Sequence, residues 1–464
     1  MEKLKIHKAT VLLIASYALP IIIETSLQML IGWVDTIMIS RRLGEFSFNG
    51  VDTANSLLGI ITLVLMVLVT GSSILIAQYV GAKDKEKSSQ IARQSILFMV
   101  ISSLVLMIPL IFLGKNLLKL MPIANEEIIS QAHIYLRYIV LFLPIQALMM
   151  LLGGIIKSTG DTKRPMFAMV GVNIANTALN YFFLYGIPFI NIGGNSGIEG
   201  PALASGISRS IGLVFLVYIV YQKNFALSLK LKEIFKANLK ILTEITTVGI
   251  PAGLEQIFYR GSMFLHKLII MSMGSSVQAA AGYSSRIEGI SFIPIFGLSM
   301  AVSILVGQKI GGKDIEKAKE ITDTSVKISI AFMIFAGLTF IIGGPFILRI
   351  FTLEKNTIAT GTTILYMIAF AQPAKAINMS LNGTFRGAGN TKWVMWVTFS
   401  GTLFVCVGLG FLLGIVLNWG IYGLWAAVIL DEWLRAAINW YHYKTGNWAS
   451  YRLVDSKHEK VKTA

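Results

Sequence analysis

Acidic side chains lie inside the long apolar stretches of this chain, at Glu24, Asp35, Glu255 and Glu288. An ionisable residue within a membrane-spanning helix costs at least about 2.5–3.5 kcal/mol, so each one needs a partner or a function. A carboxylate that is partly shielded from water can bind a proton or a hard cation such as Na⁺. These four positions are therefore the first candidates for ion binding.

Amide side chains repeat along one helical face shortly before residue 181. Asn173, Asn176 and Asn180 recur at i, i+3 and i+7, which places them on one side of a helix. Their carbonyl oxygens suit a hard cation. The alternative is hydrogen bonding between membrane helices, worth roughly 0.6–2 kcal/mol per bond. The pattern alone leaves both uses open.

Glu24 and Glu255 occupy equivalent places, because each follows a proline, Pro20 or Pro251, by one helical turn. They could be titratable acids that face a central cavity, or they could form ion pairs inside their own halves. Arg209 and Arg435 lie at similar depth and are the partners we expect for Glu24 and Glu255, respectively. We favour the ion pair for Glu24 and an ion-coupling role for Glu255.

Other ionisable residues in apolar stretches give weaker signals. Glu288 closely follows Arg286, so a local pair is as good an interpretation as substrate contact. His266 occupies the place in the second half that Asp35 occupies in the first, and a proton relay there is a minor alternative. Lys375 has no explanation from the sequence.

The amino-acid composition indicates which class of protein must hold these residues in place. The chain has 464 residues and a formal net charge of +16, yet it is 55% hydrophobic and only 14% charged. A soluble chain is about 25% charged, so a soluble nucleic-acid-binding protein is excluded. One cysteine and abundant aliphatic residues also exclude a disulfide scaffold and a disordered chain.

Twelve stretches are long and apolar enough to span a bilayer, which requires about 20 residues each. They lie at 9–38, 49–79, 93–114, 128–156, 165–190, 197–222, 241–271, 277–308, 320–345, 357–385, 393–415 and 420–443. Lys and Arg gather in alternate loops and at both ends of the chain, which predicts that both termini are cytoplasmic. We therefore expect an all-α integral membrane protein of the plasma membrane. Its Lys-, Ile- and Asn-rich usage suggests a bacterial source.

An internal repeat at an offset near 230 residues divides the chain into two halves. Four motifs recur in the same order, and they are listed here as pairs: 18–24 with 249–255, 78–87 with 308–317, 157–163 with 386–392, and 197–200 with 420–423. Because the matched basic loops lie on one side, the halves are parallel and related by an axis along the membrane normal. We predict an N-lobe at 1–222, a basic cytoplasmic connector at 223–240, a C-lobe at 241–443 and a cytoplasmic tail at 444–464.

Motifs of enzymes and nucleotide-driven pumps are missing from the sequence. It has no GxxxxGK[ST] phosphate loop, no HExxH, no GxSxG and no Cys/His metal spacing. We therefore expect no enzymatic activity, no cofactor, and no nucleotide or nucleic-acid partner. Uphill transport would draw on an ion gradient or on a separate subunit.

The ordered motifs also resemble the multidrug and toxic compound extrusion (MATE) transporters. The resemblance covers roughly residues 9–443. It is carried by Pro20 with 33–36, Gln78 through Asp84, 160–162, Asn176 and Asn180, 197–205, Pro251 with 254–256, 286–288, 306–308 and 386–389. It implies an exporter that exchanges H⁺ or Na⁺ for small organic, often cationic, compounds within the lipid bilayer.

The resemblance also implies a cation site. Asp35, Asn176, Asn180 and Ser205 match the N-lobe cation site of the family, and relatives often place a coupling acid in the helix that carries Glu255. Many relatives have Asp where this chain has Asn180. One fewer carboxylate weakens the case for Na⁺, because hard-cation affinity depends on ligand charge. H⁺ and Na⁺ therefore both stay open, with Na⁺ at Asp35, Asn176 and Asn180 as the possible metal site.

Two rival functions remain. A flippase for lipid-linked precursors has a similar architecture and would need basic residues against phosphate, which are listed here: Arg209, Arg260, Lys267 and Lys375. A membrane-embedded enzyme is the remote alternative, because no convergent catalytic motif appears.

Overall fold

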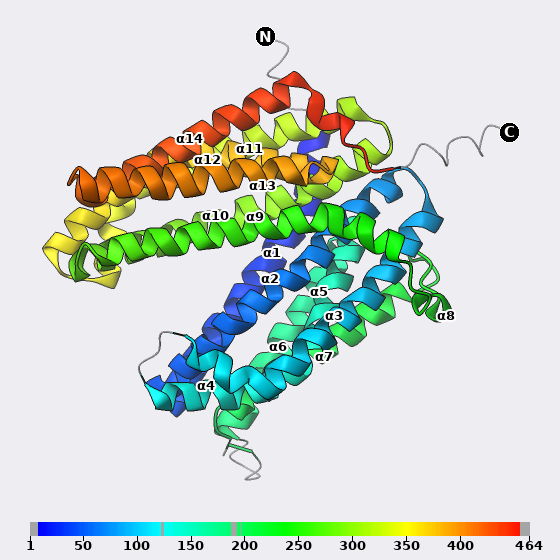
Figure 1. Cartoon of the computed structure of the whole chain (residues 1–464), viewed down its shortest axis with the longest axis horizontal. Coiled ribbons are helices and arrows are strands. Elements are labelled where there is room, and N and C mark those ends of the chain that lie inside the picture. The colour runs from blue at the N-terminus through cyan, green and yellow to red at the C-terminus, as the bar shows by residue number, and fades with distance from the viewer. Residues whose placement is uncertain (1–7, 122–124, 187–192, 195, 455–464) are drawn as a thin grey trace. The chain divides into compact units, whose positions relative to one another are not determined.

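The computed structural model describes residues 8–121, 125–186, 193–194 and 196–454, and the regular elements within these ranges are all helical. Figure 1 labels the helices. Their bounds are α1 Lys8–Leu43, α2 Glu45–Gly81, α3 Lys85–Lys119, α4 Glu126–Ile139, η2 Val140–Phe142, α5 Leu143–Ser158, α6 Lys163–Tyr185, α7 Glu199–Val220, α8 Leu231–Ile234, α9 Leu239–Met271, α10 Ser275–Gly311, α11 Ile315–Phe351, α12 Lys355–Ala388, α13 Thr391–Ser400, η3 Gly401–Leu409, η4 Leu412–Val416, α14 Gly420–Thr445 and η5 Asn447–Ser450.

The twelve predicted spans each correspond to one long helix or one interrupted helix, which confirms the all-α, twelve-helix fold. Two spans are interrupted. The span at 128–156 is α4, a 3₁₀ turn (η2) and α5, because Pro144 in the first turn of α5 lacks the N–H that a continuous helix would require. The span at 393–415 begins as α13 and continues as the π-helical segments η3 and η4.

Within the described ranges, nine helices or helix pairs are long and apolar enough to cross a membrane. Three long helices outside that group, α9, α12 and α14, carry Glu255, Lys375 and Asp431, respectively. These three helices therefore carry buried charges in the second half, as α10 does with Glu288.

The chain forms two compact units that do not follow a single cut in the sequence. Among the described residues, unit 1 comprises 8–22, 77–83 and 250–454, and unit 2 comprises the remainder between 23 and 249. Helices α1 and α9 each contribute to both units. Each changes unit beside its proline, Pro20 in α1 and Pro251 in α9.

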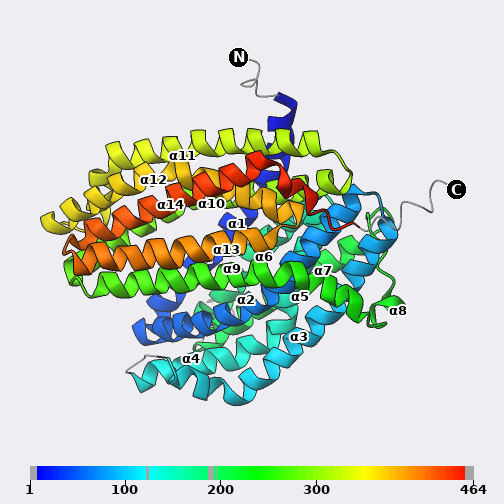
Figure 2. The same cartoon turned by 45° about the horizontal axis from the view of Figure 1, so that its top comes forward.

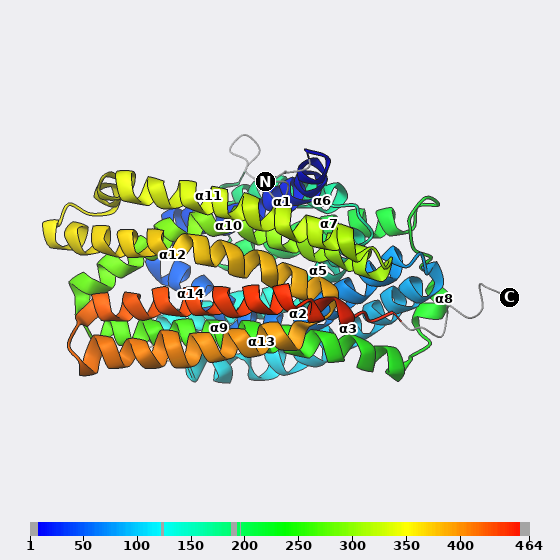
Figure 3. The ribbon, with the colours of Figure 1, turned by 90° about the horizontal axis from the view of Figure 1, so that it is seen from above.

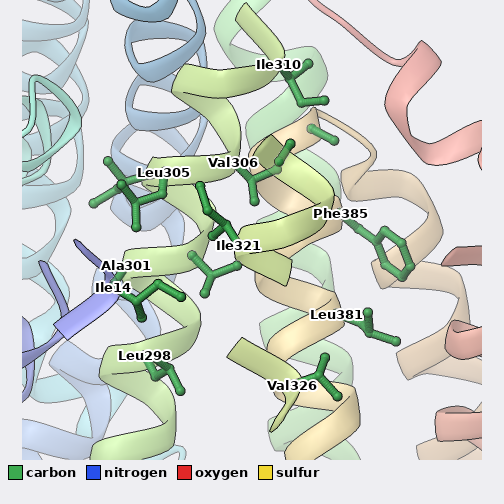
Figure 4. Packing of buried hydrophobic residues seen from close by; sticks show 14 of the residues in the cluster. Ile14, Leu298, Ala301, Leu305, Val306, Ile310, Ile321, Val326, Leu381 and Phe385 are labelled. Atoms are coloured by element: carbon green, nitrogen blue, oxygen red, sulfur yellow. The ribbon is translucent and has the colours of Figure 1, made fainter. Parts of the chain in front are cut away.

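The core of unit 1 is built from α10, α11 and α12, with the first part of α1 packed into it. Ile14 of α1, Leu305 of α10 and Phe385 of α12 are buried in one cluster (Figure 4). Two glycines let α12 approach α10 closely: a Cβ on Gly387 would lie 2.3 Å from the Ser303 carbonyl oxygen, and one on Gly383 would lie 2.4 Å from that of Ser299. Figures 2 and 3 show α11 and α14 beside α12, as their contacts require.

The repeated motif after α2 and after α10 has one local structure in both copies. Lys83 and Lys313 adopt positive φ angles of 60° and 64°, and the following Asp84 and Asp314 cap α3 and α11. Because each aspartate side chain accepts a hydrogen bond from a backbone N–H of the next helix, it satisfies a group that the helix leaves unpaired. The repeated sequence motif therefore forms the same turn and the same N-terminal cap in both copies.

The two copies of this motif also meet. A Cβ built on Gly81 would lie 1.8 Å from the Gln308 carbonyl oxygen, and one on Gly311 would lie 1.8 Å from the Gln78 carbonyl oxygen. Both contacts belong to unit 1, because residues 77–83 are part of it. The ends of α2 and α10 therefore touch backbone to backbone, which only glycine permits at these positions.

The segment after α14 is packed against unit 1. Trp448 is fully buried, donates its indole N–H to the Tyr443 carbonyl oxygen and stacks on the Tyr443 ring. Further along, the Leu453 N–H donates to Gln78 Oε1 at 2.8 Å, while Gln78 Nε2 donates to the Gly387 carbonyl oxygen. The first part of the predicted tail is therefore an ordered strap across the ends of α2 and α12.

Unit 2 is a bundle of α3 to α7 with most of α2 and parts of α1 and α9, and its α3 also holds the segment that joins the two halves. Arg93 donates to the Ser228 carbonyl oxygen at 2.8 Å and pairs with Glu233. Gln94 donates to the Lys236 carbonyl oxygen and accepts from the Asn238 N–H. The connector between the halves is thus attached to the start of α3.

Candidate functional site

A polar group in unit 2 brings together residues from α1, α6 and α7. Asn180 Nδ2 lies 2.5 Å from Asp35 Oδ1 and 3.2 Å from Asn176 Oδ1, and Asn176 Nδ2 lies 3.3 Å from Ser205 Oγ. Asn176, Asn180 and Ser205 are buried, whereas Asp35 is half-buried. The four residues that match the family's N-lobe cation site therefore form one hydrogen-bonded cluster, which we call the Asp35 cluster.

A fixed positive charge lies beside this cluster. The Arg209 guanidinium acts electrostatically on Asp35, and Arg209 Nη1 donates to Gln146 Oε1 at 2.7 Å. Buried Tyr135 of α4 also lies in the field of both charges. Arg209 of α7 therefore acts on Asp35 through its charge, and it does not pair with Glu24 as the sequence predicted.

One oxygen of the Asp35 cluster is unused. Asn180 Oδ1 is buried and has no hydrogen-bond partner among the described residues. A buried carbonyl oxygen without a donor is costly, so its position beside a carboxylate suits a proton donor or a cation. Asn173, by contrast, donates to the Met169 carbonyl oxygen of its own helix and lies outside the cluster.

Glu24 and Glu255 each form an ion pair inside one unit, with partners that differ from those predicted. Lys157 Nζ lies 2.9 and 3.1 Å from the two carboxylate oxygens of Glu24. Arg386 lies 2.5 and 3.1 Å from those of Glu255. The predicted partners Arg209 and Arg435 are wrong.

The repeat contained the signal for these pairs. Lys157 and Arg386 open the two copies of one motif, just as Glu24 and Glu255 end the two copies of another. Both basic residues lie one position beyond the predicted spans at 128–156 and 357–385, whereas the structure places them in the last turns of α5 and α12. Because a long side chain at a helix end reaches back along the helix, similar depth was a poor guide to partners.

A second polar group surrounds a cavity of about 240 Å³ in unit 1. Its charged lining residues are Glu288, Lys375, Asp431, Glu432 and Arg435, and its other polar or aromatic lining residues include Tyr259, His266, Phe292, Cys406 and Trp425. We call this space the unit 1 cavity. Its lining residues come from α9, α10, α12, η3 and α14.

The charges of the unit 1 cavity form two ion-paired groups. Lys375 pairs with Glu288, so Glu288 does not depend on its sequence neighbour Arg286. Arg435 Nε and Nη2 lie 2.9 and 2.7 Å from the two oxygens of Asp431, and Nη2 also lies 2.7 Å from Glu432 Oε1. Arg435 thus has partners on its own helix, one turn away, rather than Glu255 on α9.

Sequence reasoning missed most of this cavity. Asp431 and Glu432 were not singled out, and Lys375 was left without an explanation. The position of Lys375 in the repeat was an available signal. Lys375 lies eleven residues before Arg386, and Gln146 lies eleven residues before Lys157, so Lys375 and Gln146 are equivalent positions. Among the described residues, no three His, Cys, Asp or Glu side chains are grouped as a metal centre would require.

Comparison with known proteins places this arrangement in a family. The MatE family model matches residues 20–182 and 251–419, once in each half of the chain. The Bacillus subtilis protein described as uncharacterized transporter YisQ is 29% identical over 434 residues, covering 92% of this chain and 93% of that protein. The Thermotoga maritima protein described as probable multidrug resistance protein NorM is 27% identical over 452 residues, covering 96% of this chain and 94% of that protein.

Solved structures share the fold. A crystal structure of MATE in the bent conformation matches with a TM-score of 0.85 and 23% identity, covering 99% of this chain and all of that one. A MOP superfamily transporter from Pyrococcus furiosus, described as having a binding pocket of reverse polarity, matches with a TM-score of 0.84 and 23% identity over 97% of this chain and 98% of that one. The matched family model covers both halves, and its members are transporters rather than enzymes. The chain is thus an integral membrane protein that belongs to the MatE family, the multidrug and toxic compound extrusion transporters.

Proposed function

We propose that the protein is a secondary active exporter that exchanges H⁺ or Na⁺ for small organic, often cationic, compounds. The observation that carries the proposal is the Asp35 cluster, where a half-buried carboxylate joins a buried row of amides. Relatives described as probable multidrug resistance proteins support export of several compounds. Both termini would lie in the cytoplasm of a bacterial cell, on the side where basic loops accumulate.

Asp35 would couple the two movements through its charge. When the carboxylate is free, it attracts a cationic compound; when it holds a proton or Na⁺, that attraction is lost. Because both ligands need the same charge, they compete, and binding of the ion on the outer side releases the compound there. Movement of the two units would open the binding site first to one side of the membrane and then to the other, as in other transporters built from repeats.

Glu255 would take a smaller part in coupling than Asp35. Its carboxylate is held by Arg386 through two hydrogen bonds, so an ion could bind Glu255 only after Arg386 leaves. Glu24 is held in the same way by Lys157. Asp35 is the better coupling acid, because its hydrogen-bond donors, Asn180 and Ser205, are uncharged, and Arg209 donates its hydrogen bond to Gln146 instead.

The test is transport by purified protein in proteoliposomes, with Na⁺ and proton gradients imposed separately and with several organic cationic dyes. Asp35→Asn should abolish gradient-driven efflux while the protein still reconstitutes. Asn173→Asp, outside the cluster, serves as the matched control and should retain efflux. Full efflux by Asp35→Asn would remove Asp35 from the coupling mechanism.

A lipid-linked precursor flippase is the second candidate, and the ion pairs weigh against it. Lys375 is paired with Glu288, and Arg209 lies in the electrostatic field of Asp35 and donates to Gln146, so both basic groups already have partners that a phosphate would have to displace. The discriminating experiment replaces Arg209 and Lys375 by Glu, separately. Loss of lipid translocation with preserved dye efflux would favour the flippase.

A further inference from the structure

The unit 1 cavity has an unusual charge balance. Three carboxylates, those of Glu288, Asp431 and Glu432, face two basic side chains, those of Lys375 and Arg435. The formal charge is therefore −1 when all five are ionised. An uncompensated charge within membrane-spanning helices costs free energy. Each basic side chain in this cavity therefore takes the place of one cation that would otherwise bind from solution.

Lys375 is held on several sides. Its ammonium pairs with Glu288 of α10 and lies 5.4 Å from the centroid of the Phe292 ring, within the range of a cation–π contact. The charged or titratable groups that face it from the other elements are Tyr259 and His266 of α9, Cys406 of η3, and Asp431, Glu432 and Arg435 of α14. The side chain is buried and inside the cavity, where a diffusible cation would otherwise compensate Glu288.

The same positions in unit 2 carry different charges. Counted from the repeated motifs, Lys375 corresponds to Gln146, Glu432 to Arg209, and His266 to Asp35. In unit 2 the acid is on the first helix of the half and the fixed cation, Arg209, is on the sixth. In unit 1 the acids are on the second and sixth helices of the half, and the fixed cations, Lys375 and Arg435, are on the fourth and sixth. Equivalent positions in the two halves therefore carry different charges.

We propose that Lys375 is a tethered counter-ion that takes the place of one diffusible cation in the unit 1 cavity, and that it thereby sets how many ions the protein binds. A covalently attached ammonium cannot leave, so Glu288 takes no part in exchanging ions with solution. The charge that stays uncompensated in the unit 1 cavity is then the −1 of Asp431 and Glu432 with Arg435. The inference rests on the proposed function for its place in transport, although its test does not.

The experiment counts bound cations on the purified protein without any transport assay. The parent carries Asp35→Asn, which removes the acid of the unit 2 cluster. Lys375→Met then removes the tethered charge while keeping an unbranched chain of similar length, and Lys375→Arg keeps the charge as a matched control. Radioactive Na⁺ binding by scintillation proximity, and melting temperature against pH and against NaCl, are measured for each variant, with choline chloride as the ionic-strength control.

Lys375→Met should bind one more cation than its parent. The additional site is expected as one more equivalent of saturable Na⁺ binding than the parent and Lys375→Arg show, or as a rise in melting temperature on acidification that exceeds theirs by several degrees. Adding Glu288→Gln to Lys375→Met should abolish the gain, because the neutral pair needs no cation. If Lys375→Met folds only in Na⁺ or acid while the double variant folds without either, the same conclusion follows.

Two results would overturn the inference. One is a Lys375→Met protein that folds and binds cations as its parent does across all pH values and NaCl concentrations. The other is an additional cation in Lys375→Arg as well, because charge would then not be the cause. Dye efflux by the variants on the natural Asp35 background is a separate measurement, so failure of the export proposal would leave these binding results intact.

Discussion

Glu255 and Arg386 form a bidentate ion pair that has a counterpart in the other half of the chain. Arg386 Nη2 and Nε lie 2.5 and 3.1 Å from the two oxygens of Glu255. Glu24 and Lys157 repeat the pair at the equivalent positions. Because the pair is present in both halves whereas the charges around Asp35 and Lys375 differ, we assign it to the common framework of the repeat.

The first prediction concerns the stability of that framework. Glu24→Gln leaves the buried Lys157 ammonium without its carboxylate, which should cost about 3–5 kcal/mol of unfolding free energy. Glu255→Gln should cost less, because the Arg386 side chain is 20% exposed against 9% for Lys157. Equilibrium unfolding in mixed micelles measures both.

The control is the neutral pair, Glu24→Gln with Lys157→Met. Removing both charges should restore most of the stability, since replacing a complete buried ion pair is close to neutral. A double variant as unstable as the sum of the two single variants would contradict the ion-pair interpretation.

The second prediction concerns the choice of ion. Asn180→Asp places a second carboxylate beside Asp35, and hard-cation affinity rises with ligand charge. We expect dye efflux by this variant to depend more strongly on an imposed Na⁺ gradient than efflux by the natural protein. Asn173→Asp adds the same charge on the same helix but outside the cluster, so its Na⁺ dependence should stay unchanged. An equal change in both variants would show a general effect of added charge.

The third prediction concerns the contact between α2 and α10. Gly81→Ala and Gly311→Ala place a Cβ 1.8 Å from a backbone carbonyl oxygen of the other helix, so the helices must move apart. Overpacking of this kind should destabilise each variant by about 1–3 kcal/mol or more. Melting temperature of the purified variants is the measurement.

Gly59→Ala and Gly282→Ala are controls on the same two helices, because nothing lies within 4 Å of a Cβ at either site. They should be neutral or slightly stabilising, since alanine favours a helix over glycine by about 1 kcal/mol. If all four variants behave alike, close approach of the helices is not the cause.

The fourth prediction concerns the strap after α14. Trp448→Ala removes a fully buried indole and should cost about 3–5 kcal/mol. Trp396→Ala removes a tryptophan that is 59% exposed and should have a much smaller effect. Thermal unfolding followed by light scattering compares the two, and similar losses would mean that the strap does not stabilise unit 1.

The spans and the shared face of Asn176 and Asn180 were predictable because each depends on a local pattern, whereas the grouping with Asp35 and Ser205 was implied only by the family resemblance. Twenty apolar residues make a membrane helix wherever it packs, and spacing at i and i+4 places Asn176 and Asn180 on one face. The partners of Glu24 and Glu255 depend instead on how helices far apart in sequence are placed. Depth in the membrane does not identify the partner of an acid, because several basic residues lie at a similar depth. The internal repeat identifies the partners, because equivalent residues in the two halves form equivalent ion pairs.

The attachment of the connector to α3 has a mechanical consequence. Arg93 and Gln94 fix the connector to unit 2, so the longest stretch between the two halves is not where the chain changes unit. The four changes occur after residues 22, 76, 83 and 249; three lie inside α1, α2 and α9, and the one after residue 83 lies in the turn between α2 and α3. Three of the four passages between the units are therefore helical backbone, which main-chain hydrogen bonds hold. Pro20 and Pro251 each omit one of these bonds where α1 and α9 change unit.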